Sequence, residues 1–158
     1  MRPSFSTTRF ITFIKETLAL IEGTAITQFG QPITVYVGHP GGAVGSQSDT
    51  PFVVIMPNGE SLSQFSDTYT WSYTIAFCAD GTAMERDFTD ETTMVVINKL
   101  TALVDDFARE LNTAVGDKNI TLASLDSRWV FEEHPLTSCV LEAVFTMPNT
   151  LGISTVDF

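Results

Sequence analysis

The sequence is poor in positive charge, in cysteine and histidine, and in long apolar runs. It has 8 Lys and Arg residues against 19 Asp and Glu residues, which gives a net charge of -11. A broad basic surface for nucleic-acid phosphates is therefore not expected. No stretch reaches the roughly 18 apolar residues of a membrane-spanning helix, and the opening MRPSFSTTRF lacks the basic start and apolar run of a signal peptide. We expect a protein of a cytosol-like compartment with no membrane partner.

The cysteines and histidines are not spaced for a metal site. Cys78 and Cys139 each lie inside a strand-like run and form no CxxC pair, so we expect buried free thiols rather than a disulfide or a zinc framework. His134 follows two glutamates, but the other histidine, His39, is distant in the sequence, and a metal site needs more ligands than this group supplies. We expect no metal and no cofactor.

Signatures of catalysis are also missing. The chain contains no GxSxG and no HExxH, and neither cysteine has a local protease signature. Asp105 and Asp106 are neighbours on a predicted helix and so point about 100° apart. This arrangement favours a solvated face over two carboxylates that converge on a substrate. We therefore expect that the protein is not an enzyme.

Apolar and aromatic residues, in contrast, are plentiful. The chain is 44% hydrophobic and 11% aromatic, and it includes twelve Phe. Its 158 residues suit a single core, since one domain commonly takes about 100 to 200 residues. We expect one folded domain over residues 1–158.

Two segments have the apolar period of an amphipathic helix. Thr8 to Glu22 places apolar residues at spacings of three and four, and Gly23 stands where a helix commonly stops. The second helix begins at a cap, Thr89 or Asp90, and runs to Leu111. Its predicted apolar stripe consists of Met94, Ile97, Leu100, Val104, Phe107 and Leu111.

Strand patterns fill much of the remaining chain. The run 69–79 alternates, with one apolar face that includes Trp71; its smaller face is either solvated or meets a neighbouring subunit. The run 52–56 is closed by Pro57, Asn58 and Gly59, which are typical of a turn. With the helices, these patterns predict an α+β fold. The other strand candidates are 33–37, 119–125, 128–131 and 139–147.

A glycine-rich segment, 38–50, has no apolar period and is predicted to be a long mobile loop. It is no P-loop, because Gly45 is followed by Ser46 and Gln47, and it has no GxGxxG. Long loops in compact domains tend to be functional or disordered, so we expect an interaction arm. The tail 149–158 is predicted to be flexible or an arm. The candidate assembly contacts are His39, Gly41, Gly42, Val44 and Gly45, together with Trp129 as a candidate exposed aromatic anchor.

The element order and the phrases PFVVIMP, YTWSYTIAFCA, ALVDDFAREL and VLEAVFTMP together resemble the tail terminator (tail completion) proteins of long-tailed bacteriophages. The resemblance covers most of the chain as a pattern and brings no catalytic motif. It implies an α+β subunit with a mixed, mainly antiparallel sheet packed against an N-terminal helix and one long helix. Related neck proteins that join head to tail share the same general pattern.

The resemblance also implies a function. Such subunits form a closed ring, usually a homohexamer, that caps the tail tube protein, ends tube polymerisation and offers a docking surface to the head connector. DNA passes through the lumen without specific binding. The protein would be assembled in the host cytoplasm and lie in the virion at the head-proximal end of the tail. In this interpretation the segment 38–50 touches the tube or a neighbouring subunit.

Three alternatives remain open. A neck or connector subunit has the same general pattern. A tail tube subunit would form open-ended polymers rather than closed rings. A small soluble enzyme or ligand-binding domain would need no self-association.

Overall fold

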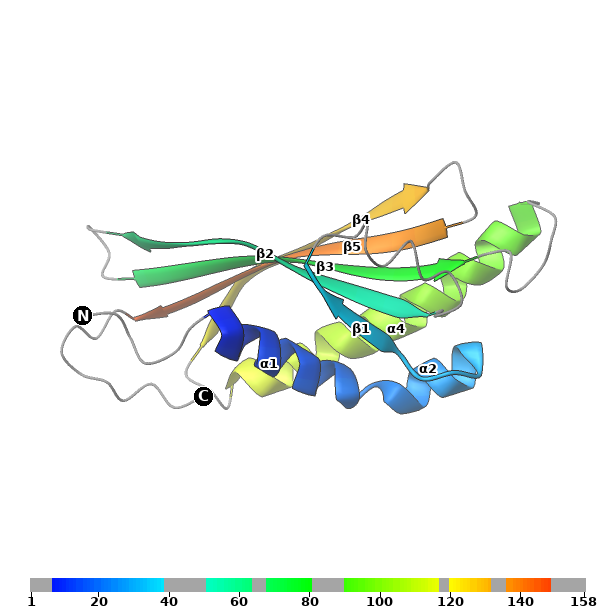
Figure 1. The fold of residues 1–158 in the computed structure, drawn as a ribbon, viewed down its shortest axis with the longest axis horizontal. Helices are drawn as coiled ribbons and strands as arrows, with labels where there is room; N and C mark the ends of the chain where they lie inside the picture. Colours follow the sequence, from blue (N-terminus) through cyan, green and yellow to red (C-terminus); the bar gives the residue numbers. More distant parts are fainter. Residues whose placement is uncertain are drawn as a thin grey trace.

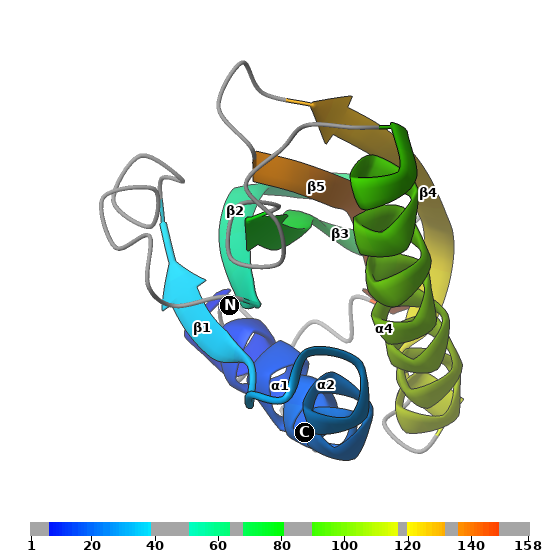
Figure 2. The same ribbon diagram turned by 90° about the vertical axis from the view of Figure 1, so that its right-hand side faces the viewer.

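The fold is a five-stranded sheet with helices packed on one face (Figures 1 and 2). The computed structural model describes residues 7–38, 51–63, 68–80, 90–116, 120–131 and 136–148. Within these ranges it confirms the predicted α+β class. The elements are α1 (Thr7–Ala19), α2 (Glu22–Phe29), β1 (Thr34–Val37), β2 (Phe52–Ser63), β3 (Thr68–Asp80), α4 (Asp90–Gly116), β4 (Thr121–Phe131) and β5 (Leu136–Pro148).

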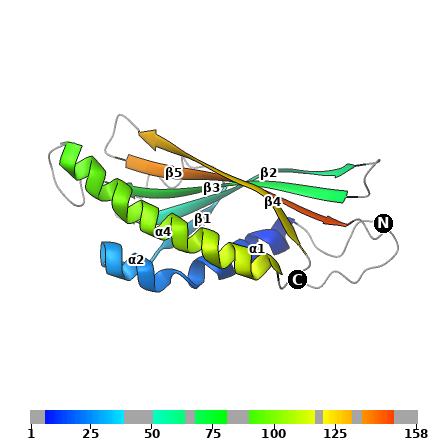
Figure 3. The same ribbon diagram turned by 180° about the vertical axis from the view of Figure 1, so that it is seen from behind.

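The sheet is mixed, with strand order β1-β2-β3-β5-β4. β1 runs parallel to β2, and every other neighbouring pair is antiparallel. β2 with β3 and β4 with β5 are consecutive antiparallel pairs, and the pairing of β3 with β5 joins them into one sheet. Figure 2 shows this sheet curving around the helices, and Figure 3 shows α4 lying across it.

The main core lies between the helices and the sheet. Phe10 of α1 is fully buried there, with its ring centroid 4.9 Å from that of Trp71 and 5.3 Å from that of Phe145. Because successive strand residues point to opposite faces, every second residue of β3 enters this core. Burying one such large side chain stabilises the fold by about 1.5–3 kcal/mol. The β3 residues that face the helices are Trp71, Tyr73, Ile75, Phe77 and Ala79.

No described helix or strand covers the opposite side of the sheet, which we call the open face. It nevertheless carries a second, smaller apolar cluster, so β3 is buried on both sides over part of its length. The sequence did not decide whether the smaller face of β3 is solvated. In the structure Thr74 on this face is buried and Ser72 is half-buried, so the face is not simply solvated. The small cluster consists of Phe52, Val54, Ala76, Cys78 and Val140.

The N-terminal segment contains two helices where one was predicted. The chain turns at Leu20 and Ile21, and α2 then includes Gly23, so the predicted stop at Gly23 is wrong. Ile21 is buried, which fixes the turn against the core. The true left-handed end is Gly30, with φ 74° and its N–H donating to the carbonyl of Ile26 at 2.8 Å.

β2 continues through the predicted turn. The carbonyl of Ile55 accepts a hydrogen bond from Gly38 N–H at 2.9 Å, and the next residue that faces the β1 side is Pro57, which has no N–H to donate. A β-bulge follows between Pro57 and Gly59, and Gly59 has φ 151°, which favours glycine. The residues expected to form a turn thus end the β1 pairing and bend a continuing strand.

Two further predictions need correction. β4 is one strand rather than two, because Asp126 and Ser127, which lie between the two predicted strands, pair with Glu142 and Leu141 in the same ladder. Met94 does not belong to the buried stripe of α4: it is 61% exposed. Among the residues of α4 whose burial is described, 94–116, the first buried one is Val96.

Candidate functional site

A belt of polar side chains crosses the open face over four adjacent strands. Asn58 of β2 donates from Nδ2 to Thr74 Oγ1 of β3 at 2.8 Å and to Glu142 Oε2 of β5 at 3.3 Å. Thr74 in turn donates to Glu142 Oε2 at 2.9 Å. Arg128 of β4 lies with Nη2 at 3.6 Å from Glu142 Oε1. We call these four residues the polar belt.

The bulge in β2 falls at Asn58. Pro57 pairs with Tyr73 and Gly59 pairs with Ser72, so Asn58 is the additional residue of the bulge. Thr74 is 8% exposed, and a buried hydroxyl without partners would be costly. Here the hydroxyl accepts from Asn58 and donates to Glu142, so its burial is compensated.

A further acidic residue, Asp126 of β4, lies beside the belt. Asp126 pairs with Glu142 in the strand register, and like charges directly opposite each other destabilise a sheet. Arg128 offsets part of this repulsion, but its side chain is 63% exposed and that of Glu142 is 39% exposed. Solvent screening makes an exposed pair of this kind weak. The belt therefore offers partly free carboxylate and guanidinium groups to a polar or basic surface of another molecule.

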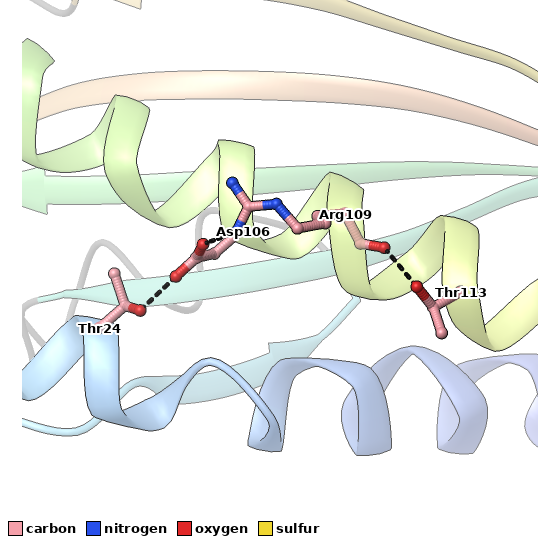
Figure 4. Close-up of polar contacts among 4 residues, drawn as sticks. All are labelled: Thr24, Asp106, Arg109 and Thr113. Carbon is pink, nitrogen blue, oxygen red and sulfur yellow. Dashed lines mark hydrogen bonds and ion pairs between the residues drawn. The ribbon is translucent and has the colours of Figure 1, made fainter.

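A second polar contact joins α2 to α4 (Figure 4). Thr24 donates from Oγ1 to Asp106 Oδ2, and Arg109 Nη1 lies 2.6 Å from Asp106 Oδ1. The hydrogen bond from Thr24, together with Arg109, lowers the pKa of Asp106 below 3.8 although partial burial opposes the shift. Asp105 and Asp106 were predicted to lie on a solvated face. Asp105 is exposed, as predicted, but Asp106 is half-buried and accepts the hydrogen bond that joins the two helices.

The cysteines are free and buried, as predicted. Cys78 lies in the small cluster on the open face, where its Sγ accepts from Ser138 Oγ at 3.3 Å, whereas Cys139 lies in the main core. Burial raises the pKa of Cys139 from 9.0 to about 11, and the charge of Asp105 adds to this rise. The two thiols are thus on opposite faces of the sheet.

Of the predicted assembly contacts, Trp129 alone lies in the described part of the chain. Trp129 is half-buried and packs against the main core, and Trp71 is 1% exposed within it. The predictions on the glutamates beside His134 and on the tail 149–158 lie outside the described residues. Outside them too are His39, Gly41, Gly42, Val44 and Gly45.

Sequence reasoning missed the polar belt, although one member stands out. Glu142 is the single charged residue in VLEAVF, and a carboxylate inside such an apolar strand calls for hydrogen-bond partners. Its partners Asn58 and Thr74 come from other strands, and only the register identifies them.

The described surface also carries scattered apolar side chains. Among the described residues, no group of three or more His, Cys, Asp or Glu is placed to hold a metal ion. No helix in the same part of the chain has the length and apolar character needed to cross a membrane. The large apolar side chains that are exposed are Leu20, Ile26, Val37, Met94 and Val95.

Comparison with known proteins yields no relative: no family model matches the chain, and no curated protein matches its sequence significantly.

Proposed function

We propose that this protein is the ring-forming terminator of a long bacteriophage tail, which caps the tube and presents a surface to the head connector. The observation that carries the proposal is the two-sided subunit. One face of the sheet is covered by α1, α2 and α4, and no described element covers the other. The order of the elements also agrees with the pattern on which the resemblance rests, apart from the additional helix α2.

A closed ring needs two unlike surfaces on every subunit, because each copy meets its two neighbours through different faces. This chain has such a pair in its helical side and its open face. Its two sheet edges are also unlike. At one edge β1 is a short parallel strand, and at the other β4 is a longer antiparallel strand with a bulge. These differences favour a directional association over a symmetric dimer.

The test is the mass of the purified protein by light scattering across concentration, followed by negative-stain imaging, each with and without purified tube protein. Closed rings with a hole of roughly 20 Å or more, wide enough for duplex DNA, are the expected species. Open filaments would instead favour a tube subunit. A protein that stays monomeric even on tube ends would contradict the proposal.

A variant addresses the predicted contact segment. Replacing Gly38 to Thr50 with a Gly/Ser linker is expected to preserve the circular dichroism spectrum and the unfolding midpoint and to impair ring formation and head-to-tail joining. The control, Asn112→Ala, changes an exposed residue of α4 that lies outside both predicted contact segments. An unchanged yield of joined particles with the linker variant would contradict the assigned role of the segment.

A further inference from the structure

The short helix α2 is weakly anchored. Of its eight residues only Ala25 is buried, and Phe29 is half-buried. Burying an alanine contributes far less apolar area than burying a leucine or a phenylalanine. The neighbouring helix α1, in contrast, is held by a full apolar stripe. Its buried residues are Phe10, Phe13, Ile14, Thr17 and Leu18.

Two contacts with side chains of α4 supplement the apolar packing of Ala25 and Phe29 on the main core. Thr24 donates to Asp106, which also pairs with Arg109, as Figure 4 shows. At the end of α2, the ring of Phe29 faces α4: its centroid lies 5.7 Å from the ammonium of Lys99. The side chain of Asp106 is 29% exposed and that of Arg109 is 70% exposed. Water can therefore replace these contacts at little cost, which is not true of a packed core.

The two ends of α2 differ. At its start the chain bends at Leu20 and Ile21 but continues in the general direction of α1, and at its end the chain turns back after Gly30 into β1 (Figure 1). At the start, Ile21 is buried, and its carbonyl accepts from the N–H groups of Thr24 and Ala25 at 3.1 and 3.2 Å. At the end, Gly30 has φ 74° and nothing within 4 Å of an added Cβ. Motions of short segments commonly turn on a few such residues at element ends.

From these contacts we propose that α2 is a lid on α4, which opens as a unit between Ile21 and Gly30 and is latched by the hydrogen bond from Thr24 to Asp106. Opening uncovers the side of α4 between Lys99 and Asp106 while α1, α4 and the sheet stay folded. The inference does not depend on ring formation and holds for the isolated chain.

Hydrogen exchange with mass spectrometry tests the lid. In the wild-type protein, the amides of 23–29 are expected to exchange at least tenfold faster than those of 100–111, because local opening costs less than global unfolding. The Thr24→Val variant is expected to raise exchange in α2 about fivefold, the usual effect of one lost hydrogen bond. Exchange in α1 and α4 should not change.

Thr27 provides the matched control. It lies in the same helix, is exposed, and donates only to the carbonyl of Gly23 within α2, at 2.9 Å. The Thr27→Val variant should therefore leave exchange of the lid close to the wild-type rate. Equal effects of the two valine variants would overturn the latch, and equal exchange rates for α2 and α4 in the wild-type protein would overturn the lid itself.

Asp106 and Asp105 give a second matched pair. The Asp106→Ala variant removes the acceptor of the latch and is expected to increase exchange in α2 as Thr24→Val does. The Asp105→Ala variant changes an exposed neighbour on the same helix and is expected to leave the lid unchanged. If both alanine variants speed exchange in α2 equally, the loss of a negative charge on α4 controls the opening rather than the hydrogen bond from Thr24. That result would contradict the proposal.

Discussion

Asp126 of β4 and Glu142 of β5 lie directly opposite each other on the open face, so two acidic residues occupy facing positions of an antiparallel pair. Arg128 approaches Glu142 only to 3.6 Å and is largely exposed. The protein thus keeps two like charges at facing positions near the β4 edge of a face that no described helix covers. Interaction surfaces often retain charges that stability alone would remove.

The first prediction concerns this pair. Asp126→Asn is expected to stabilise the protein by about 0.2–1 kcal/mol, because it removes a cross-strand repulsion. Urea unfolding at low salt measures the change. At 1 M NaCl the gain should shrink, since the Debye length falls to about 3 Å. A destabilised variant at both salt concentrations would show that Asp126 has a favourable partner instead.

The second prediction concerns the aromatic centre of the core. Phe10→Ala is expected to cost about 3–5 kcal/mol of unfolding free energy, because it opens a cavity between α1 and β3. The exposed Ile26 offers a control, and Ile26→Ala should stay within about 0.5 kcal/mol of wild type. Denaturant unfolding at an unchanged m-value measures the loss of unfolding free energy in each variant. Similar losses for the two variants would contradict the described packing.

The third prediction compares two glycines of one segment. Gly23 lies inside α2 and Gly30 ends it at φ 74°, and both have open space around an added Cβ. Gly23→Ala should stabilise by up to about 1 kcal/mol, since it removes backbone entropy from the unfolded chain. Gly30→Ala should destabilise by about 1–2 kcal/mol, because alanine is strained in the left-handed region. Thermal unfolding would reveal shifts of opposite sign, and shifts of the same sign would refute the assigned boundary.

The fourth prediction follows from the thiol of Cys139, whose pKa burial raises from 9.0 to about 11. Between these values the unfolded chain loses the thiol proton while the native chain keeps it, so stability falls as pH rises. Below pH 9 this contribution is fully present. Cys139→Ala should flatten the decline from pH 9 to 11 relative to wild type, and unfolding curves in that range provide the measurement. An unchanged slope would mean that other groups, such as tyrosines, cause the decline.

The fold class was predictable from the sequence because the strongest patterns lie in the longest elements. The alternation of 69–79 identified β3, and the apolar period up to Leu111 identified α4. The ends of the strands and helices were harder to predict from the sequence. Pro57, Asn58 and Gly59 are typical turn residues, and only the pairing of both flanks with β3 shows that they form a bulge. Likewise, the spacing of four from Ile21 through Ala25 to Phe29 was hidden by a glycine that suggested a stop.

The candidate site was less predictable than the fold. Glu142 could have been singled out, since it interrupts an apolar strand, but its contacts with Asn58 and Thr74 depend on strands 84 and 68 residues away in the sequence. The hydrogen bond between Thr24 and Asp106 was unpredictable for the same reason, because the two residues are 82 positions apart in the sequence. Local patterns carry no information on such pairs until the register and the helix packing are known.

The pairing of β3 with β5 has a consequence for how the molecule forms. Residues 68–80 must wait for residues 136–148 before the centre of the sheet can close, and contacts so distant along the chain slow folding. During synthesis the consecutive pair β2 and β3 leaves the ribosome early, and the backbone N–H and C=O groups along one edge of β3 stay unpaired until β5 has emerged. A nascent chain stalled before Leu136 would thus be a target for chaperones, and full synthesis would release it.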